Sequence, residues 1–361
     1  MPWRLVWRSC LVVLVFVVGF AGRAATDGRL HLFWIDSEGG GSTLVVTPTG
    51  ESVLIDAGNP GGRDAARIHR VATQVAGLTR IHHLIVTHFH LDHFGGAAEL
   101  AGLMPIDEIW DNGLPQTDPD GRRESTWPLT SKSYRELNVR ERHRVSPGTL
   151  VPLRSAGTPL FLRCVIARQE VWKPTPEGVA TWSPRVAAAS TIPAKARDTS
   201  DNANSSAWVL GFGGFRFYDG GDLTWNAEAS LVHPEILVPE VDVYQVTHHG
   251  LDVSNHPDLL RALNPRVTIM NNGPTKGTMA EVMQTLRALP DLRAQYQVHQ
   301  NTRPDGATNN VADEFMANLG AAAECEGHFI QASVASDGAS YSFRIPARGH
   351  ERTYPVRQRT R

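Results

Sequence analysis

The apolar residues at the start of the chain fall into short runs that are bounded by turn residues. Short runs rich in β-branched and aromatic residues are typical of strands. Three are predicted, at residues 30–36, 42–48 and 52–56. Over residues 63–78 the apolar side chains recur at helical spacing, and residues 84–86 then predict a buried strand.

Strands and helices continue to alternate along the rest of the chain, which predicts an α/β fold in one domain over residues 26–346. Strands are predicted at residues 106–110, 160–167, 241–250, 266–270 and 294–299, hairpins at 204–222 and 330–345, and helices at 127–138, 257–263, 278–289 and 311–319. Residues 169–200 contain several prolines and show neither helical nor strand periodicity, as expected for a lid or an insertion. Residues 347–361 carry five arginines and predict a frayed basic C-terminal tail.

Residues 1–25 have the pattern of a secretory signal peptide. Arg4 and Arg8 precede a short apolar core, and small residues, Ala24 and Ala25, follow it. The alternative is an uncleaved anchor, although the apolar core is short for a membrane span. We therefore expect a secreted or periplasmic protein with no transmembrane span after cleavage.

The composition adds little beyond this. The chain is 41% hydrophobic and 20% charged, as ordinary globular proteins are. Without residues 1–25 it would carry 32 basic and 37 acidic residues, a formal charge of −5, which gives no drive towards nucleic acid. Cys164 and Cys325 would remain, either paired or as free thiols.

The strongest chemical pattern is H-x-H-x-D-H at residues 88–93. Three imidazoles and one carboxylate lie within six residues, directly after a predicted buried strand and before Gly95-Gly96. This ligand set suits zinc, and also iron or manganese. On a tight strand-to-helix turn, His88 and His90 can reach one metal while Asp92 and His93 point towards a second.

Two further groups of candidate ligands follow predicted strands. Asp219 and Asp222 end the hairpin at residues 204–222, and His248 and His249 close the strand at residues 241–250. Neighbours on a strand point to opposite faces, so we expect only one of the two histidines to bind metal directly. We favour His248, with His249 acting on substrate or behind the ligands.

The H-x-H-x-D-H motif resembles that of the metallo-β-lactamase superfamily. The resemblance extends over most of the mature chain and implies a four-layer αβ/βα sandwich with a two-metal centre, most simply of Zn²⁺. It implies that Asp56 orients the metal loop from behind and that Asp222 bridges both metals. Asp219 is the competing acid, but Gly221-Asp222-Leu223 matches the family phrase better.

More narrowly, the chain resembles the extracytoplasmic hydrolase domain of the competence DNA-uptake protein ComEC. The shared phrases are Phe33-Trp34-Ile35-Asp36, Asn204-Ser205-Ser206, Gly220-Gly221-Asp222-Leu223, His248-His249-Gly250 and Asn264-Pro265-Arg266-Val267. In two other phrases the chain departs from this pattern. Glu38 and Gly39 stand where the family has Gly-Gln, and the later phrase at residues 271–276 lacks its histidine.

Members of the superfamily also give the first metal a third histidine before the bridging Asp. Here the intervening histidine is His143, which lies in a basic loop and makes a poor candidate. Asp201, Asn202 or Asn204 are weak substitutes, so the first metal site is expected to be loosely held, filled only with substrate, or empty.

These patterns predict a secreted metallo-hydrolase in which a metal-bound hydroxide attacks the substrate. Asp92 or Asp222 would orient the hydroxide, and the candidates for the leaving-group acid are His249, His256 and His299. The ComEC likeness favours a small or oligomeric phosphoester, which Lys276, Arg216 or Arg303 would bind. The alternatives are hydrolysis of a lactam, lactone or thioester, and a non-catalytic metal-stabilised binding protein.

Overall fold

The chain folds around two large β-sheets that face each other. The structure is a computed structural model, and it describes residues 27–175, 182–320 and 325–359. The predicted signal peptide lies outside the described residues. Among the helices that are described, none is both long and apolar enough to cross a membrane.

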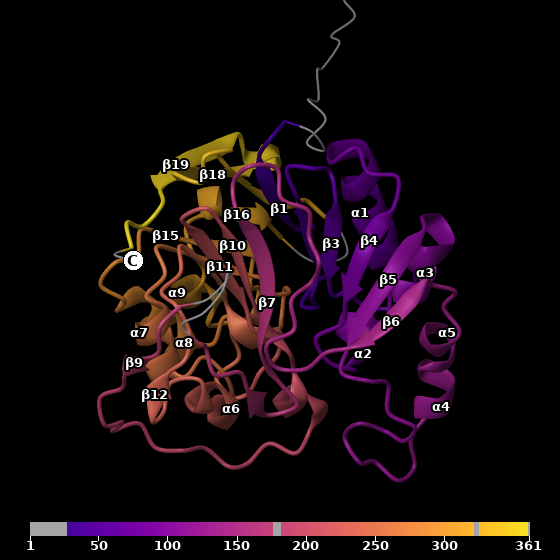
Figure 1. Cartoon of the computed structure of the whole chain (residues 1–361), viewed down its shortest axis with the longest axis horizontal. Helices are drawn as coiled ribbons and strands as arrows, with labels where there is room; N and C mark the ends of the chain where they lie inside the picture. The colour runs from indigo at the N-terminus through magenta and orange to yellow at the C-terminus, as the bar shows by residue number, and fades with distance from the viewer. Residues whose placement is uncertain (1–26, 176–181, 321–324, 360–361) are drawn as a thin grey trace, which may run out of the picture.

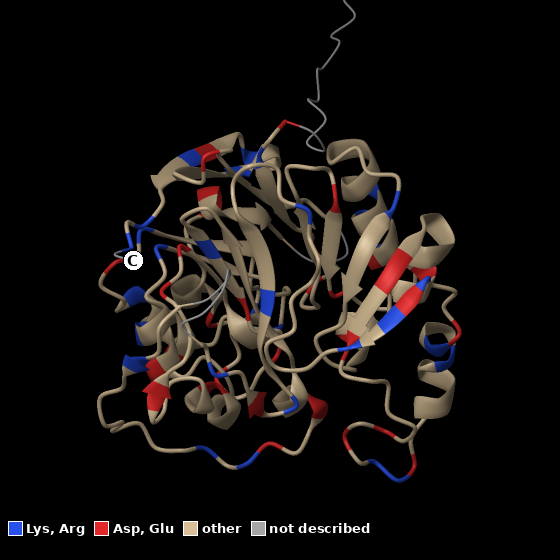
Figure 2. Cartoon of the chain, in the orientation of Figure 1, with Lys and Arg blue, Asp and Glu red and all other residues tan. Residues whose placement is uncertain are grey.

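The first sheet has nine strands among the described residues and contains the first and the last strand of the chain, β1 and β19. In spatial order they are β19 (His350–Pro355), β18 (Ser340–Ile345), β17 (Ile330–Val334), β1 (Leu30–Trp34), β2 (Thr43–Val46), β3 (Ser52–Ile55), β4 (Ile81–Ile85), β5 (Ile106–Asp111) and β6 (Glu141–Arg144). Strands β3 to β6 run parallel, and the others pair antiparallel. At the edge, β6 is mostly exposed and carries charges that discourage pairing with another chain (Figure 2).

The second sheet has eight strands among the described residues, and the five from the edge strand β16 to β11 are parallel. In spatial order they are β16 (Met316–Asn318), β15 (Ala294–His299), β14 (Val267–Met270), β13 (Val243–Gln245), β11 (Phe215–Asp219), β10 (Ala207–Phe212), β7 (Leu160–Ala167) and β8 (Glu170–Val171). A two-stranded sheet, β9 (Arg185–Val186) with β12 (Glu235–Ile236), lies apart. Residues 169–200, apart from the undescribed 176–181, are otherwise without regular structure, as the sequence predicts.

Helices cover the outer face of each sheet, as Figure 1 shows. The helices are α1 (Arg63–Arg70), η2 (Val71–Val75), α2 (Leu91–Phe94), α3 (Ala97–Leu103), α4 (Trp127–Thr130), α5 (Lys132–Arg135), η3 (Asp201–Asn204), α6 (Trp225–Ser230), η4 (Thr247–Gly250), α7 (Pro257–Leu263), α8 (Ala280–Arg287), α9 (Gly306–Asn309), η5 (Asp313–Phe315) and η7 (Pro346–Arg348).

Three hydrophobic cores correspond to this layering. The central core packs the two sheets together through side chains such as Trp34 and Trp208. One outer core lies between the first sheet and α1, η2 and α3, and the other lies between the second sheet and α7 and α8. Strands such as β1 and β10 are buried along their whole length, because both faces of each sheet are covered. The four-layer αβ/βα sandwich is therefore confirmed.

Two predicted elements were wrong. Residues 311–319 were predicted as a helix but form η5 and the edge strand β16, because Gln297 and His299 of β15 need a strand partner. Residues 350–355 of the predicted frayed tail form β19, which pairs along the whole of β18. Its Tyr354 is buried in the central core, and burial of such a ring outweighs the fraying of a charged end.

The basic residues that follow β19 also have partners. Arg357 lies 2.8 Å from Asp291, and Arg359 lies 2.8 Å from the buried Asp242 carboxylate. The tail is therefore held against the second sheet by specific ion pairs.

Candidate metal centre

The H-x-H-x-D-H motif follows the carboxyl end of β4 and includes most of the short helix α2. His88 lies in the loop after β4, His90 precedes α2 in extended conformation, and Asp92 and His93 lie within the helix. Gly95 and Gly96 follow because the backbone is crowded there. A Cβ at Gly96 would lie 2.3 Å from the Ala57 carbonyl oxygen. The glycines thus let α2 pack onto the turn that carries Asp56.

Asp56 holds two of the motif histidines in a fixed orientation. Its Oδ2 accepts a hydrogen bond from His93 Nδ1 at 2.6 Å and another from Thr87 Oγ1 at 2.8 Å. Because the Thr87 hydroxyl donates its proton to Asp56, it must accept at 3.1 Å from His88 Nδ1. Both imidazoles therefore turn their Nε2 atoms away from Asp56, as metal-binding histidines with a carboxylate behind them do.

Asp222 lies opposite this loop, directly after β11, with its carboxylate buried among four imidazoles. Its Oδ2 is 3.3 Å from His93 Nε2, 3.4 Å from His248 Nε2 and 4.0 Å from His88 Nε2. Its Oδ1 is 3.2 Å from His249 Nε2. The competing acid, Asp219, instead accepts from the Gly221 backbone N–H, and burial raises its pKa to about 7.

The two adjacent histidines do not lie on a strand. β13 ends at Gln245, and His248 and His249 lie in η4, both in the left-handed region with φ of 54° and 55°. The alternation argument for choosing between them was therefore wrong. Non-glycine residues adopt this conformation at some cost, and such strain gathers at functional sites.

The left-handed backbone directs both rings towards Asp222, and their second nitrogens are held from behind. His249 Nδ1 donates to the Asn271 carbonyl oxygen at 2.9 Å, and His248 Nδ1 is bonded to Ser254 Oγ at 3.0 Å. Gly277 leaves room for this turn, since a Cβ there would lie 1.9 Å from the His249 carbonyl oxygen.

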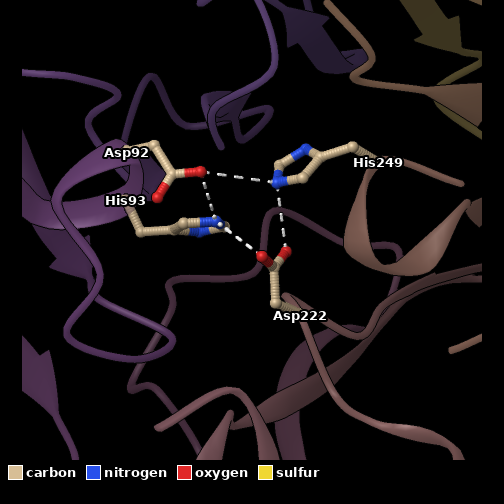
Figure 3. Close-up of side chains that lie close together, drawn as sticks. All are labelled: Asp92, His93, Asp222 and His249. Atoms are coloured by element: carbon tan, nitrogen blue, oxygen red, sulfur yellow. Dashed lines mark ion pairs between the residues drawn. The ribbon is translucent and has the colours of Figure 1, made fainter. Parts of the chain in front are cut away.

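Asp92, His93, Asp222 and His249 form one compact group (Figure 3). One ligand atom from each lies within 4.8 Å of the other three. The sequence argument preferred His248 as the ligand completing this group and placed His249 behind it. The structure places His249 in the group, whereas His248 approaches Asp222 from the side of His88.

The donor atoms of this region fit a metal centre. His88 Nε2, His93 Nε2, His249 Nε2 and Asp222 Oδ1 are all buried, and none has a hydrogen-bond partner among the described residues. Buried polar atoms are seldom left unpaired, because each costs roughly 1–3 kcal/mol. Imidazole nitrogens with a carboxylate match the preferences of Zn²⁺, Fe and Mn²⁺.

The ionisation of the group follows from its crowding. Burial disfavours charge on His93, but Asp222, Asp56 and Asp92 outweigh burial and raise the pKa of His93 well above its ordinary value. Burial lowers the pKa of His88 well below the ordinary value and that of His248 to about 4. Those two imidazoles are therefore neutral, which is the form that binds metal.

The remaining motif histidine, His90, has a different environment. Its Nε2 is bonded to Asp120 Oδ1 at 2.9 Å, and its ring centroid is 4.7 Å from that of His88. A cavity of about 540 Å³ opens beside it, bounded in part by Asp120 and Trp127. Sequence reasoning missed Asp120, because nothing in the loop around it marks it as different from other acidic turn residues.

The substitutes considered for the missing third histidine are not equivalent. Asp201 accepts the Phe89 backbone N–H at 2.7 Å and Asn204 donates to Asp201, so both serve the loop itself. Asn202 lies 3.4 Å from His248 Nε2. His143 lies away from the group, stacked on Trp110 at 3.8 Å.

Of the three cations proposed to bind phosphate, one lies at the centre. Lys276 Nζ donates to Asp92 Oδ2 at 2.5 Å, and its side chain is 34% exposed. Burial works against ionisation of Asp92, but His93 and Lys276 outweigh it and lower the pKa of this carboxyl. Arg216 bonds to the carbonyls of Gly213 and Phe215 on the far end of β11.

Two predicted acids lie elsewhere. His256 caps α7, where its Nδ1 accepts from the Asp258 backbone N–H at 3.2 Å. His299 ends β15 and groups with Asp36 and Cys325. Arg303, the third of the cations, pairs with Asp305. The metal-binding and catalytic roles of all these residues stay predictions.

Comparison with known proteins gives a family but not a substrate. The model of the metallo-beta-lactamase superfamily matches residues 36–140, which include the H-x-H-x-D-H motif. No curated protein matches the sequence.

Several solved structures are similar to the chain at low sequence identity. Igni18, a metallo hydrolase from the archaeon Ignicoccus hospitalis, is 12% identical, with 74% of this chain and 94% of that chain covered and a TM-score of 0.39. CmlA, a diiron β-hydroxylase from Streptomyces venezuelae, is 13% identical, with 74% and 52% covered and a TM-score of 0.41. MEM-A1, a subclass B3 metallo-beta-lactamase from a soil metagenome, is 13% identical, with 60% and 79% covered and a TM-score of 0.34.

We infer nothing about substrate or metal from structures this distant. The family match, however, covers the loop that supplies most of the candidate ligands, and the described sheets and helices form the corresponding sandwich. Residues 36–140 therefore match the metallo-beta-lactamase superfamily, and the described chain has the αβ/βα sandwich of the metallo-beta-lactamase fold.

Proposed function

We propose that the protein is an exported, two-metal hydrolase of phosphoesters, most simply of a phosphodiester. The observation that carries the proposal is the set of buried, unpartnered donor atoms on His88, His93, His249 and Asp222. Export is supported by the pattern of residues 1–25.

The arrangement favours an open catalytic site over a closed structural one. Structural zinc sites are completed by four protein ligands in a tetrahedral cage. Here Asp222 Oδ1 faces His249, and its Oδ2 faces His93, His248 and His88. Asp92 lies beside His93 and His249 in the same group. Asp222 and these imidazoles would hold the metal ions, and together with Asp92 they offer more ligands than one four-ligand cage needs.

Metal ions held there would supply Lewis acidity and a water acidic enough to attack near neutral pH. The residues of the chain orient the ligands. Asp56 fixes the orientation of His88 and His93, and the backbone carbonyl of Asn271 fixes that of His249. With the ligands preset, little reorganisation is needed when substrate binds.

The position of the Lys276 ammonium favours an anionic substrate. Its ammonium reaches the centre from the loop after β14 and remains partly exposed. Once metal shares the charge of Asp92, this ammonium is available to a phosphate oxygen. A substrate carboxylate would suit it as well, so the same site accommodates a lactam or another acyl substrate as the second candidate.

The test combines metal content with turnover of two substrates. Purified mature protein is assayed for metals per chain and for hydrolysis of bis(p-nitrophenyl) phosphate and nitrocefin. We expect phosphodiester turnover in the wild type, with Asp222→Asn losing near two metals per chain and roughly 100-fold or more of the rate.

The matched control is Asp219→Asn, which changes the neighbouring buried acid and should keep both metals and turnover. Turnover of nitrocefin alone would replace the phosphoester with an acyl substrate. Stoichiometric metal without turnover of either compound would favour a metal-stabilised binding protein.

A further inference from the structure

A second group of metal-ligating side chains lies outside the candidate metal centre. Asp36 follows β1, His299 ends β15, and Cys325 lies in the segment that leads to β17. One ligand atom from each lies within 4.8 Å of the other two. Asp36 and His299 are fully buried and Cys325 is partly buried, so three segments far apart in sequence converge on one interior point.

The histidine of this group presents an unused nitrogen. His299 Nδ1 donates to the Gln300 carbonyl oxygen at 2.9 Å, which leaves Nε2 with a free lone pair in the neutral ring. That Nε2 is buried and has no hydrogen-bond partner in the described part of the chain. A buried imidazole nitrogen without a partner needs a ligand of its own.

The cysteine is a free thiol that faces the same point. Cys325 Sγ donates to Asp36 Oδ2 at 2.9 Å and lies 3.4 Å from Asn318 Oδ1. Burial and the Asp36 carboxylate raise the pKa of this thiol to about 12. The other described cysteine, Cys164, is buried within β7, where its thiol donates to the Ile166 carbonyl oxygen.

The net charge of the side chains around Asp36 favours binding of a cation. Arg67 lies 3.2 Å from Asp36 and 3.1 Å from Glu38. Arg63 lies 2.6 Å from Glu38 and 2.7 Å from Asp64, so three carboxylates share two guanidiniums and one negative charge remains. Binding of a divalent cation with loss of the thiol proton would bring this group of charges to zero. Arg67 also donates to the Cys325 carbonyl oxygen at 3.0 Å, which keeps the cysteine in place.

We propose that Asp36, His299 and Cys325 form a separate metal site, with Zn²⁺ as its ion. One carboxylate oxygen, one imidazole nitrogen and one thiolate sulfur match the ligand preferences of zinc, and water has access to a fourth position from the partly exposed cysteine. On binding, a sulfur–metal bond forms and the thiol proton leaves to solvent. The ion would tie the segment before β17 to the ends of β1 and β15.

Sulfur ligation provides a test that the candidate metal centre does not affect, because that centre contains no cysteine. The whole mature protein is prepared free of metal and loaded with Co²⁺, and its ultraviolet and visible absorption spectrum is recorded. Thiolate bound to Co²⁺ gives a strong near-ultraviolet charge-transfer band, which we expect in the wild type. Cys325→Ser should abolish the band and lower the metal content by one per chain.

Cys164→Ser is the matched control and should keep the band. His299→Ala should weaken or remove it while leaving the thiol in place. Absence of the band in Co²⁺-loaded wild-type protein would overturn the site without any need for a variant. An unchanged metal content in Cys325→Ser would overturn it as well. Neither result would bear on the proposed hydrolase activity, which is measured separately with bis(p-nitrophenyl) phosphate.

Discussion

Lys276 is a residue at the candidate metal centre that lies where this chain departs from the ComEC pattern. It lies in the phrase at residues 271–276, where the chain lacks the histidine of the ComEC pattern, and its ammonium contacts Asp92. The cation is therefore placed beside the candidate metal ligands, where an anionic substrate would meet it.

We expect Lys276→Met to lower kcat/KM for bis(p-nitrophenyl) phosphate by roughly 10- to 100-fold, because a charge-assisted hydrogen bond to the substrate is lost. The loss should fall mainly on KM, with metal content unchanged. Steady-state kinetics with metal analysis would check this, with Lys132→Met on the exposed face of α5 as control. Unchanged kinetics would mean that Lys276 only neutralises Asp92.

At the scale of elements, η4 depends on a buried acid behind it. Glu228 on α6 is fully buried, and its Oε2 accepts the His256 backbone N–H at 2.7 Å. Burial raises the pKa of Glu228 to about 8. The protonated acid thus holds the start of α7, which follows the loop that carries His248 and His249.

This raised pKa predicts a pH dependence of stability. The folded chain keeps the Glu228 proton up to about pH 8, whereas the unfolded chain releases it near 4.5. Folding therefore binds a proton between these values, and the free energy of unfolding falls as the pH rises through them. Glu228→Gln should flatten this fall by roughly 1 kcal/mol per pH unit.

Urea unfolding at several pH values across this range would measure the slope. Glu281→Gln, which changes an exposed glutamate on α8, is the control and should leave the slope as it is. An equal slope in wild type and Glu228→Gln would show that the buried acid is ionised in the folded protein.

For the whole molecule, the candidate centre joins the two halves of the sandwich. The H-x-H-x-D-H loop comes from the first sheet, and Asp222 and His249 come from the second (Figures 1 and 3). Metal that binds both halves binds the folded state alone and stabilises it.

Removal of metal by a chelator should lower Tm by roughly 5–10 °C, which corresponds to a few kcal/mol for a ligand well above its Kd. Thermal unfolding with and without chelator would show this. Asp222→Asn should begin at the lower Tm and respond little to chelator. If wild-type protein loses its metal with no change in Tm, the centre does not connect the two halves.

Local spacing was enough to predict much of this protein. Strands β1 to β5, the hairpin of β10 and β11 and the helix α1 lie where the apolar period predicts them, because side-chain period follows directly from backbone geometry. The H-x-H-x-D-H loop was predicted for a similar reason. Its residues are so close in sequence that a single turn brings them together.

Other features depend on contacts between distant parts of the chain, and the local spacing of apolar residues does not predict them. The left-handed backbone at His248 and His249 depends on Gly277, which lies far along the chain and leaves space for the turn. The strand β19 exists because β18 offers an edge and the core accepts Tyr354.

The same distinction separates the two metal sites. Residues 88–93 by themselves predict a metal-binding turn, since the covalent chain limits the distances between their side chains. Asp36 and Cys325 are 289 residues apart, and they meet because β1 and β17 are neighbours in one sheet. Contacts of that kind depend on which strands pair and in what register, and burial of the whole core determines that pairing.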